Sequence, residues 1–323
     1  MTKEELRIVY MGTPEFAVES LRRLVEGGYN VVGVVTMPDK PIGRHQAQLS
    51  QSAVKQYAVS QGLRVLQPVK LKDEGFVEEL RSLDADLQIV VAFRMLPEIV
   101  WSMPRFGTFN LHASLLPQYR GAAPINWAII NGEKETGITT FFLQHEIDTG
   151  NIIQQVRIPI EEDDNAGTVH DRLMQLGGDL VLETVENILS DSVVPIPQEQ
   201  LSEGMELKAA PKLFKETCRI DWGRGVEDVH NFVRGLSPYP AAWTELIHAE
   251  KAFNLKIYKT RCVKDGIISQ LPAGSLFSED GKLMAVLADG ILEIQELQIA
   301  GKKRMNASDF LNGFRMDGKE RVI

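Results

Sequence analysis

Residues 1–93 alternate between short apolar runs and longer amphipathic stretches. Residues 6–12 (LRIVYMG) and 30–36 (NVVGVVT) are nearly continuous apolar runs rich in β-branched side chains, which is typical of strands covered on both faces. Residues 14–28, between them, repeat their apolar positions at helical spacing. Strand, helix and strand in this order predict the βαβ unit of a parallel sheet.

The same alternation continues along the chain. Further helices are predicted at 51–62 and 75–83, and further strands at 64–68 and 87–93. Strands that alternate with helices in this way form a sheet with helices on both faces. We therefore expect a doubly wound, parallel α/β architecture for the first part of the chain.

The first strand-to-helix turn lacks the glycines that hold a phosphate group. It reads Gly12-Thr13-Pro14-Glu15-Phe16, which is not G-x-G-x-x-G, and no Walker motif occurs in the sequence. Nicotinamide, flavin and ATP are therefore not expected as ligands of the predicted sheet.

The later part of the chain has a different pattern. Residues 191–209 mix prolines and polar residues without a period, which predicts a linker between a first domain at 1–190 and a second at 210–323. After it, residues 226–236 have helical spacing and several short alternating runs follow, separated by glycine-containing turns. We expect a small antiparallel, OB-like β-barrel.

Charge is distributed unevenly along the chain, whose formal net charge is −9. Residues 1–207 carry 17 Lys and Arg against 29 Asp and Glu (−12), whereas residues 208–323 carry 18 against 15 (+3). An acidic protein is not a general nucleic-acid binder, but the second part could contact a polyanion. Chance variation of the surface remains an alternative.

Composition limits the compartment and the cofactors. No apolar run is long enough to span a bilayer, the N-terminus lacks the features of a signal or transit peptide, and Cys218 and Cys262 are far apart in the sequence. The six histidines show no metal-ligand spacing. We expect a cytoplasmic, monomeric protein with no membrane segment and no metal.

Candidate chemistry lies in the middle of the chain. If residues 107–112 (GTFNLH) form a strand, Asn110 and His112 share one face of it. Asp148, in a predicted hairpin turn, could reach the imidazole. An amide donor for an oxyanion, an imidazole and a carboxylate together permit acyl transfer to a nitrogen nucleophile. The alternative is a hydrogen-bonded pair with a purely structural role.

Family resemblance makes this hypothesis specific. Residues 109–153 (FNLHASLLPQYRGAAPINWAIINGEKETGITTFFLQHEIDTGNII), with IVYMGTPEFA, VVTMPDKPIGR, CRIDW and AGKKRMNASDFL, resemble the formyltetrahydrofolate-dependent formyltransferases over nearly the whole chain. The resemblance implies a formyltransferase domain followed by an OB-like tRNA-binding domain. It also implies transfer of a formyl group from 10-formyltetrahydrofolate to the α-amino group of initiator methionyl-tRNA.

The resemblance also assigns roles to residues. The family's catalytic residues match Asn110, His112 and Asp148; its folate-binding loop matches Ser114, Leu115, Leu116 and Pro117; its pterin-pocket wall matches Phe93, Arg94 and Met95. Arg94 stands where relatives usually have glycine, in a shorter loop. Arg44 matches an arginine that the family uses near the acceptor stem, and the basic cluster Lys302, Lys303 and Arg304 is a further candidate for tRNA binding.

Two other functions are compatible with the sequence. A formyltransferase of the same fold could act on a UDP-amino sugar or on glycinamide ribonucleotide. A non-catalytic folate- or RNA-binding protein could use the same scaffold.

Overall fold

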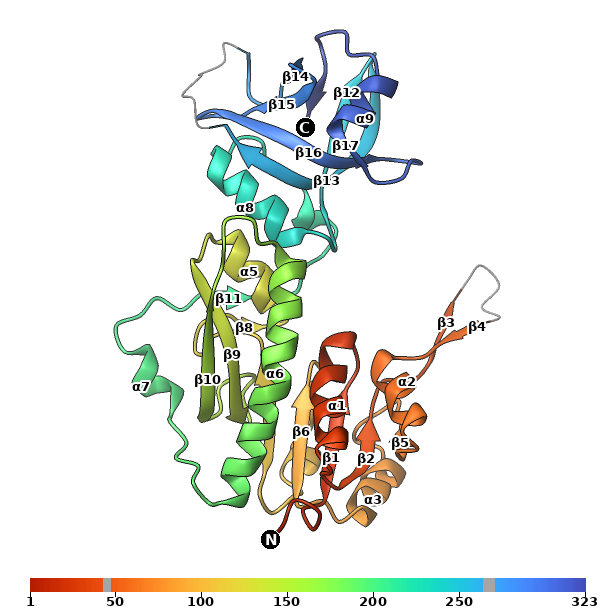
Figure 1. Cartoon of the computed structure of the whole chain (residues 1–323), viewed down its shortest axis with the longest axis vertical. Coiled ribbons are helices and arrows are strands. Elements are labelled where there is room, and N and C mark those ends of the chain that lie inside the picture. The colour runs from red at the N-terminus through yellow and green to blue at the C-terminus, as the bar shows by residue number, and fades with distance from the viewer. Residues whose placement is uncertain (43–47, 264–270) are drawn as a thin grey trace. The chain divides into compact units, whose positions relative to one another are not determined.

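A seven-stranded sheet organises the first part of the chain, in a computed structural model that describes residues 1–42, 48–263 and 271–323 (Figure 1). The strands follow the spatial order β10, β9, β7, β6, β1, β2, β5. Those from β5 to β7 are parallel, and β9 is antiparallel to β7. Their bounds are β1 (Ile8–Gly12), β2 (Val31–Val35), β5 (Val65–Leu66), β6 (Leu87–Val91), β7 (Thr108–His112), β9 (Glu135–Phe142) and β10 (Ile152–Pro159).

The order of the strands indicates where a ligand-binding crevice is expected in this sheet. The chain winds outward from β1 through β2 to β5, and in the other direction from β6 to β7. In open α/β sheets, ligands bind outside the carboxyl ends of the strands, near the point where the winding reverses. The carboxyl ends of β1, β6 and β7 are therefore the place to look for a functional site.

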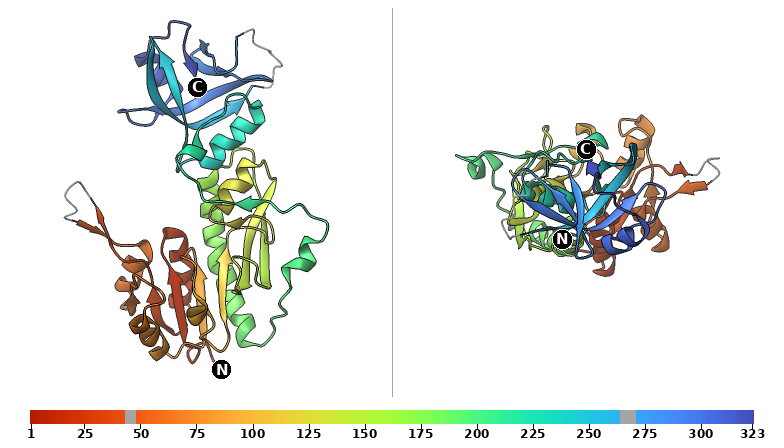
Figure 2. Two further views of the ribbon diagram at one scale, coloured as in Figure 1. Left: turned by 180° about the vertical axis from the view of Figure 1, so that it is seen from behind. Right: turned by 90° about the horizontal axis from the view of Figure 1, so that it is seen from above.

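Helices cover both faces of the sheet (Figures 1 and 2). On one face Val9 and Val90 pack with Phe76 of α3 (Glu74–Ser82) and Val100 of α4 (Glu98–Trp101). On the other face the Tyr10 hydroxyl donates to the carbonyl of Ala17, next to α1 (Val18–Glu26). The helices of this part are η1 (Glu15–Ala17), α1 (Val18–Glu26), α2 (Ala53–Ser60), α3 (Glu74–Ser82), α4 (Glu98–Trp101), α6 (Ala166–Leu189) and α7 (Gln198–Ser202).

Local sequence explains where two of these helices begin. The Ser52 hydroxyl accepts the backbone N–H of Lys55 and caps α2, and the Asp73 carboxylate accepts that of Phe76 and caps α3. Such caps satisfy N–H groups that have no partner inside the helix. Short strands complete this part: β3 (Lys40–Ile42) pairs with β4 (Gln48–Ser50), and β8 (Arg120–Gly121) and β11 (Ala209–Ala210) lie further along.

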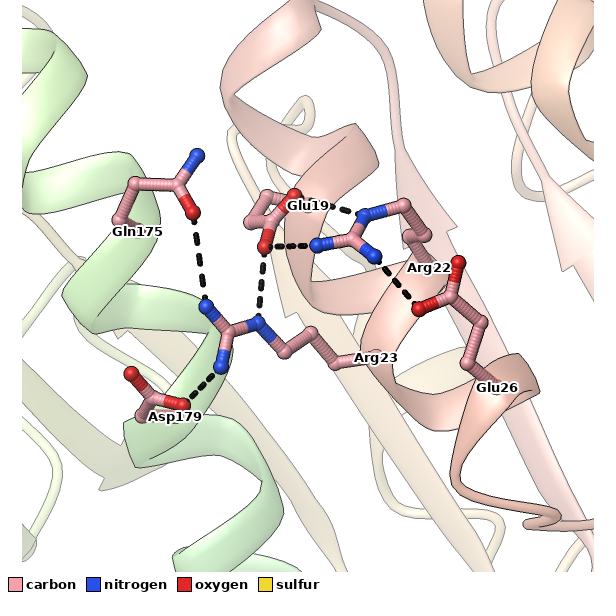
Figure 3. A network of polar contacts seen from close by, with 6 residues as sticks. All are labelled: Glu19, Arg22, Arg23, Glu26, Gln175 and Asp179. Atoms are coloured by element: carbon pink, nitrogen blue, oxygen red, sulfur yellow. Dashed lines mark hydrogen bonds and ion pairs between the residues drawn. The ribbon is translucent and has the colours of Figure 1, made fainter.

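A charged network joins α1 to α6 (Figure 3). Glu19, with only 9% of its side chain exposed, accepts from Arg22 at 2.6 Å and from Arg23 at 2.8 Å. Arg23 continues to Asp179 and Gln175 of α6. The hydrogen bond from Arg22 is the main reason that the pKa of Glu19 lies below its ordinary value, and Arg23 adds to the effect. Glu19 is therefore the centre of this contact.

We expect Glu19→Gln to destabilise the protein by about 1–3 kcal/mol at pH 7, because a buried charged partner of two arginines is lost. A lowered pKa in the folded state means that the ionised Glu19 stabilises the protein above its ordinary value of 4.5 and stops doing so as the pH falls through the folded pKa. The gap in melting temperature between wild type and variant should therefore shrink as the pH falls below 4.5.

Glu26→Gln is the matched control. Glu26 lies on the same helix and pairs with the same Arg22, but 58% of its side chain is exposed. Exposed pairs contribute about 0–1 kcal/mol, so its effect should be small at every pH. Equal destabilisation by both variants would contradict a central role for Glu19.

A curled antiparallel sheet forms the later part of the chain. The order is β14, β15, β16, β13, β12, β18, and β17 pairs with β16. The bounds are β12 (Ala242–His248), β13 (Lys251–Cys262), β14 (Leu276–Glu279), β15 (Lys282–Val286), β16 (Ile291–Ile299), β17 (Met305–Asn306) and β18 (Arg321–Val322). The two ends of this order meet, because Leu276 N donates to Glu320 O and Val322 N donates to Gly274 O. The sheet thus closes into a small barrel.

Helices α5 (Pro124–Ile130), α8 (Val226–Leu236) and α9 (Ala307–Gly313) and the short η2 (Glu216–Cys218) accompany the barrel. α8 has the bounds that its periodicity predicted. Val229 and Val233 of α8 pack into one buried cluster with Leu255 and Ile257 of β13. The predicted fold class, a doubly wound α/β domain followed by an OB-like barrel, is confirmed.

Glu320 fastens the C-terminal strand. Its carboxylate, wholly buried, accepts from His248 Nδ1 at 2.9 Å and from the backbone N–H groups of Asp317 and Gly318. His248, Asp317 and Glu320 bring potential metal ligands within 4.8 Å of one another. Because these carboxylate oxygens already accept hydrogen bonds, we assign the group to holding β18 in place.

Contacts divide the chain into two compact units. The first comprises Met1–Gly121, Gly137–Ile158 and His170–Ala209, and the second comprises Ala122–Thr136, Pro159–Val169 and Ala210–Ile323. The second unit thus includes two short segments from within the range 1–190. The domain boundaries predicted from sequence stay a prediction. Among the described residues, no helix combines the length and the apolar character needed to cross a membrane.

Candidate active site

β7 brings Asn110 and His112 to the carboxyl end of the sheet. Asn110 pairs in register with Val90 of β6, and Val90 belongs to the cluster under α3 and α4, so Asn110 and His112 face that side. Leu111 faces the other side, toward α6. A Cβ at Gly177 of α6 would lie 2.7 Å from Cδ2 of Leu111, so the Leu111 side chain packs closely against the helix at this glycine.

His112 is 7% exposed, and its contacts define its tautomer. Nε2 lies 2.9 Å from the carbonyl oxygen of Tyr119. A carbonyl oxygen only accepts hydrogen bonds, so Nε2 carries a proton. Nδ1 is the atom left to take up or release a second proton, and it lies 3.9 Å from Oδ2 of Asp148.

Asp148 lies in the connection between the neighbouring strands β9 and β10, where the sequence predicts the turn of a hairpin. β9 ends at Phe142 and β10 begins at Ile152, so this connection is a loop over residues 143–151 and is longer than the three residues Asp148–Gly150. Asp148 has a φ of 56°, and its Oδ2 accepts the backbone N–H of Gly121 at 3.0 Å. The carboxylate is thus held beside the imidazole without being bonded directly to it.

The side chain of Asn110 contains a buried oxygen, Oδ1, that has no hydrogen-bond partner among the described residues. A buried amide group without a partner costs about 1–3 kcal/mol. Such groups are uncommon and often mark a site where a ligand binds or chemistry takes place.

The loop after His112 is held rigidly. The Ser114 hydroxyl donates to Gln118 O at 2.7 Å, and the Ser114 carbonyl accepts from Thr139 at 2.6 Å. Gln155 donates to Leu116 O at 2.7 Å. The side chains of Ser114, Leu116 and Pro117 are buried, and Leu115 packs over the backbone of β9 at Gly137. These four predicted folate-binding residues therefore build a fixed shelf next to His112.

The segment Phe93–Met95 follows β6 at the same end of the sheet. Met95 is 73% exposed and Phe93 is half-buried. The guanidinium of Arg94 donates to the carbonyl of Val69 at 2.8 Å and to that of Pro68, and burial lowers the pKa of Arg94. Arg94 thus ties this loop to the residues that follow β5, a bond that a glycine cannot make.

The predicted tRNA-binding residues lie away from these loops in the sequence. Lys302 and Lys303 are exposed. Arg304 donates to Glu296 at 2.7 Å and lies over the ring of Tyr258, so its charge is partly neutralised. Arg44 lies outside the residues that the structure describes.

One residue next to this site, Gln198, is not predicted by the sequence pattern. Gln198, at the start of α7 and inside the predicted linker, is fully buried against Arg120 and the Asp148 loop. Residues 191–209 have no periodicity, and nothing in their composition distinguishes one glutamine from the next. No local signal could have found it, because its partners are 48 to 78 positions away.

Comparison with known proteins gives consistent matches over the whole chain. Residues 6–185 match the family model described as formyl transferase, and residues 212–315 match formyl transferase, C-terminal domain. The chain is 66% identical to a methionyl-tRNA formyltransferase from Phocaeicola vulgatus, over 100% of both chains. It is 64% identical to one from Parabacteroides distasonis, over 98% of each.

Among solved structures, the fold resembles HypX from Aquifex aeolicus in complex with tetrahydrofolic acid. The TM-score is 0.63 at 19% identity, and the match covers 97% of this chain and 48% of that one. At this identity the likeness supports the fold alone.

Proposed function

Because the chain belongs to the methionyl-tRNA formyltransferases of the formyl transferase family, we propose that it transfers the formyl group of 10-formyltetrahydrofolate to the α-amino group of initiator methionyl-tRNA. Two observations support the proposed mechanism: Asn110 and His112 share one face of β7 at the carboxyl end of the sheet, and Asp148 Oδ2 lies 3.9 Å from His112 Nδ1. We also propose that the chain acts as a cytoplasmic monomer.

In the proposed reaction the unprotonated α-amine attacks the formyl carbon. A C–N bond forms and the carbonyl electrons move to oxygen, giving a tetrahedral intermediate. The Asn110 amide donates a hydrogen bond to this oxyanion, an interaction whose loss typically costs about 3 kcal/mol. His112 Nδ1 takes the proton shed by the new ammonium and passes it to the folate nitrogen as that C–N bond breaks.

Asp148 has an electrostatic role in this scheme. While His112 holds the second proton, its ring is an imidazolium whose Nδ1–H points into the region of the Asp148 carboxylate, 3.9 Å away. The carboxylate favours that charge, and the Tyr119 carbonyl keeps Nε2 protonated throughout. The Tyr119 carbonyl and the Asp148 carboxylate together keep the imidazole in the tautomer that can accept a proton at Nδ1.

For the folate, we propose a pocket between the Ser114–Pro117 shelf and the Phe93–Met95 loop. The fixed backbone of the shelf supports this placement, as does the position of the exposed Met95 after β6, the strand next to β7. We expect calorimetry to detect heat when a folate analogue binds. The hydrogen bonds that hold Ser114–Pro117 do not involve Arg94, which stands where relatives usually have glycine.

Purified protein and 10-formyltetrahydrofolate should be incubated with initiator methionyl-tRNA, elongator methionyl-tRNA, glycinamide ribonucleotide and a UDP-amino sugar in parallel. Formylation of the initiator tRNA at a much higher rate than any other acceptor is the expected result. Faster transfer to the sugar or the ribonucleotide would replace this proposal by the corresponding alternative. No transfer to any amine would favour a non-catalytic binding protein.

For tRNA, we propose that Lys302 and Lys303 contact phosphate groups, and that Arg44 has the role implied by the family. Lys303→Glu should lower the slope of log affinity against log salt concentration by about 1, because one fewer counterion is released. The measurement is tRNA binding over a range of salt concentrations. Lys70→Glu, the same charge change at an exposed position of the first unit, should leave the slope unchanged; a matching slope in both variants would exclude the cluster.

A further inference from the structure

We propose that Gln198 is a positioning residue that holds Asp148 and Arg120 in their working geometry, which makes the segment before the second domain a part of the active site. The inference rests on the proposed function and adds to it a residue outside the Asn110, His112 and Asp148 set.

The first support is the completeness of the Gln198 contacts. The side chain is fully buried. Its Nε2 donates to the carbonyl of Asp148 at 2.9 Å and to that of Gly150 at 2.8 Å. Its Oε1 accepts from Arg120 Nε at 3.0 Å and from Nη2 at 2.6 Å. Both hydrogens of the amide and its oxygen are therefore engaged, which fixes the orientation of the group.

The second support is that these contacts join the two loops that meet at Asp148. Arg120 immediately precedes Gly121, whose N–H bonds the Asp148 carboxylate. The amide nitrogen of Gln198 thus binds the backbone of the Asp148 loop. Its amide oxygen binds Arg120, the residue next to Gly121. Moving Gln198 would change the relative position of both loops.

Arg120 adds a chemical reason for an amide at this position. No carboxylate among the described residues pairs with Arg120, whose guanidinium donates instead to the neutral side-chain oxygen of Gln198. Only glutamine and asparagine offer an acceptor to the guanidinium together with two donors to the carbonyls. Glutamate would keep the acceptor but place a second oxygen against two carbonyl oxygens.

The chain around Gln198 is fastened to the same two loops. Ile196 and Ile152 exchange two backbone hydrogen bonds of 2.8 Å, and the carbonyl of Lys208 accepts the N–H of Tyr119 at 2.7 Å. Tyr119 is the residue whose own carbonyl sets the tautomer of His112. Residues 196–208 therefore run along the site and hold backbone groups on either side of it.

The experiment compares Gln198→Glu with Gln200→Glu, which makes the same charge change at an exposed position of α7. Displacement of a catalytic group by about 1 Å can cost about 100-fold in rate. We expect Gln198→Glu to lower kcat by about 10- to 100-fold, with KM for both substrates within about twofold, and Gln200→Glu to behave as wild type. Equal kcat values in the two variants would overturn the inference.

A double-mutant cycle distinguishes positioning from a general loss of stability. If Gln198 acts through Asp148, Gln198→Glu should cost much less in the background of Asp148→Asn than in wild type. Full additivity of the two effects would refute action through Asp148. If Gln198→Glu does not fold, Gln198→Met, which keeps the length but removes the hydrogen bonds, enters the same cycle.

Hydrogen exchange separates this inference from the proposed reaction. In Gln198→Glu, the amides of residues 143–151 should exchange faster than in Gln200→Glu, whether or not any amine is formylated. Faster exchange in a protein without transferase activity would retain the positioning role while the proposed function fails. Unchanged exchange in an active enzyme would reject the positioning role and leave the function standing.

Discussion

Replacing His112 with alanine is expected to lower the rate of formyl transfer by about 100- to 10,000-fold, because in the proposed mechanism its imidazole moves the proton from the attacking amine to the leaving nitrogen. Nδ1 is the free ring atom, since Nε2 is bonded to the Tyr119 carbonyl. Single-turnover assays with methionyl-tRNA measure the loss directly. Binding of a folate analogue should persist.

His145→Ala is the control for the loss of an imidazole. His145 lies in the same connection as Asp148, but 75% of its side chain is exposed, so its removal should leave the rate within about twofold. A single-turnover rate of His112→Ala within about twofold of wild type would refute the proton-transfer role.

Replacing Asn110 with alanine is expected to lower the single-turnover rate by about 100- to 1,000-fold, the usual cost of removing one oxyanion donor. Stability should respond in the opposite direction. The buried Oδ1 of Asn110 has no donor among the described residues, so its removal eliminates an uncompensated polar atom. The melting temperature of Asn110→Ala should therefore equal or exceed that of wild type.

Folate-analogue affinity serves as the control for Asn110→Ala, since the shelf at Ser114–Pro117 does not depend on this side chain. Asn110→Asp tests the sign of the interaction, because a carboxylate would repel the oxyanion and should cost at least as much as alanine. A near-normal single-turnover rate in Asn110→Ala would refute the assigned role.

Elements with strong local signals were predicted well from the sequence. The buried runs around Ile8–Gly12 and Leu87–Val91 became adjacent parallel strands, and α8 begins and ends where its spacing predicted. In each case hydrophobic burial and local propensity favour the same structure. Asn110 and His112 could be placed on one face for the same reason, since a strand fixes the direction of alternate side chains.

Features that depend on distant contacts were not predicted. The long helix α6 is not predicted from the sequence. It contains Gly177 and Gly178, which weaken a helical signal, and a Cβ at Gly177 would lie 2.7 Å from the Leu111 side chain. The Asp-Thr-Gly sequence predicts the hairpin connection between β9 and β10 but not its length of nine residues, which depends on contacts with other loops. Gln198 could not be predicted, since its hydrogen bonds connect it to residues far away in the sequence.

The hydrogen bonds between residues 196–208 and the loops that carry Tyr119 and Asp148 affect where the protein can be cut. A fragment that stops at the end of α6 would look complete by its sheet and helices, yet it would strip Asp148 and Tyr119 of backbone partners and expose the guanidinium of Arg120 to water. A fragment extended to Ala209 would keep these contacts, but its residues 122–136 and 159–169 would lose the rest of the second compact unit. Any shortened chain meant to retain the Asp148 loop in place should therefore include the residues up to Ala209.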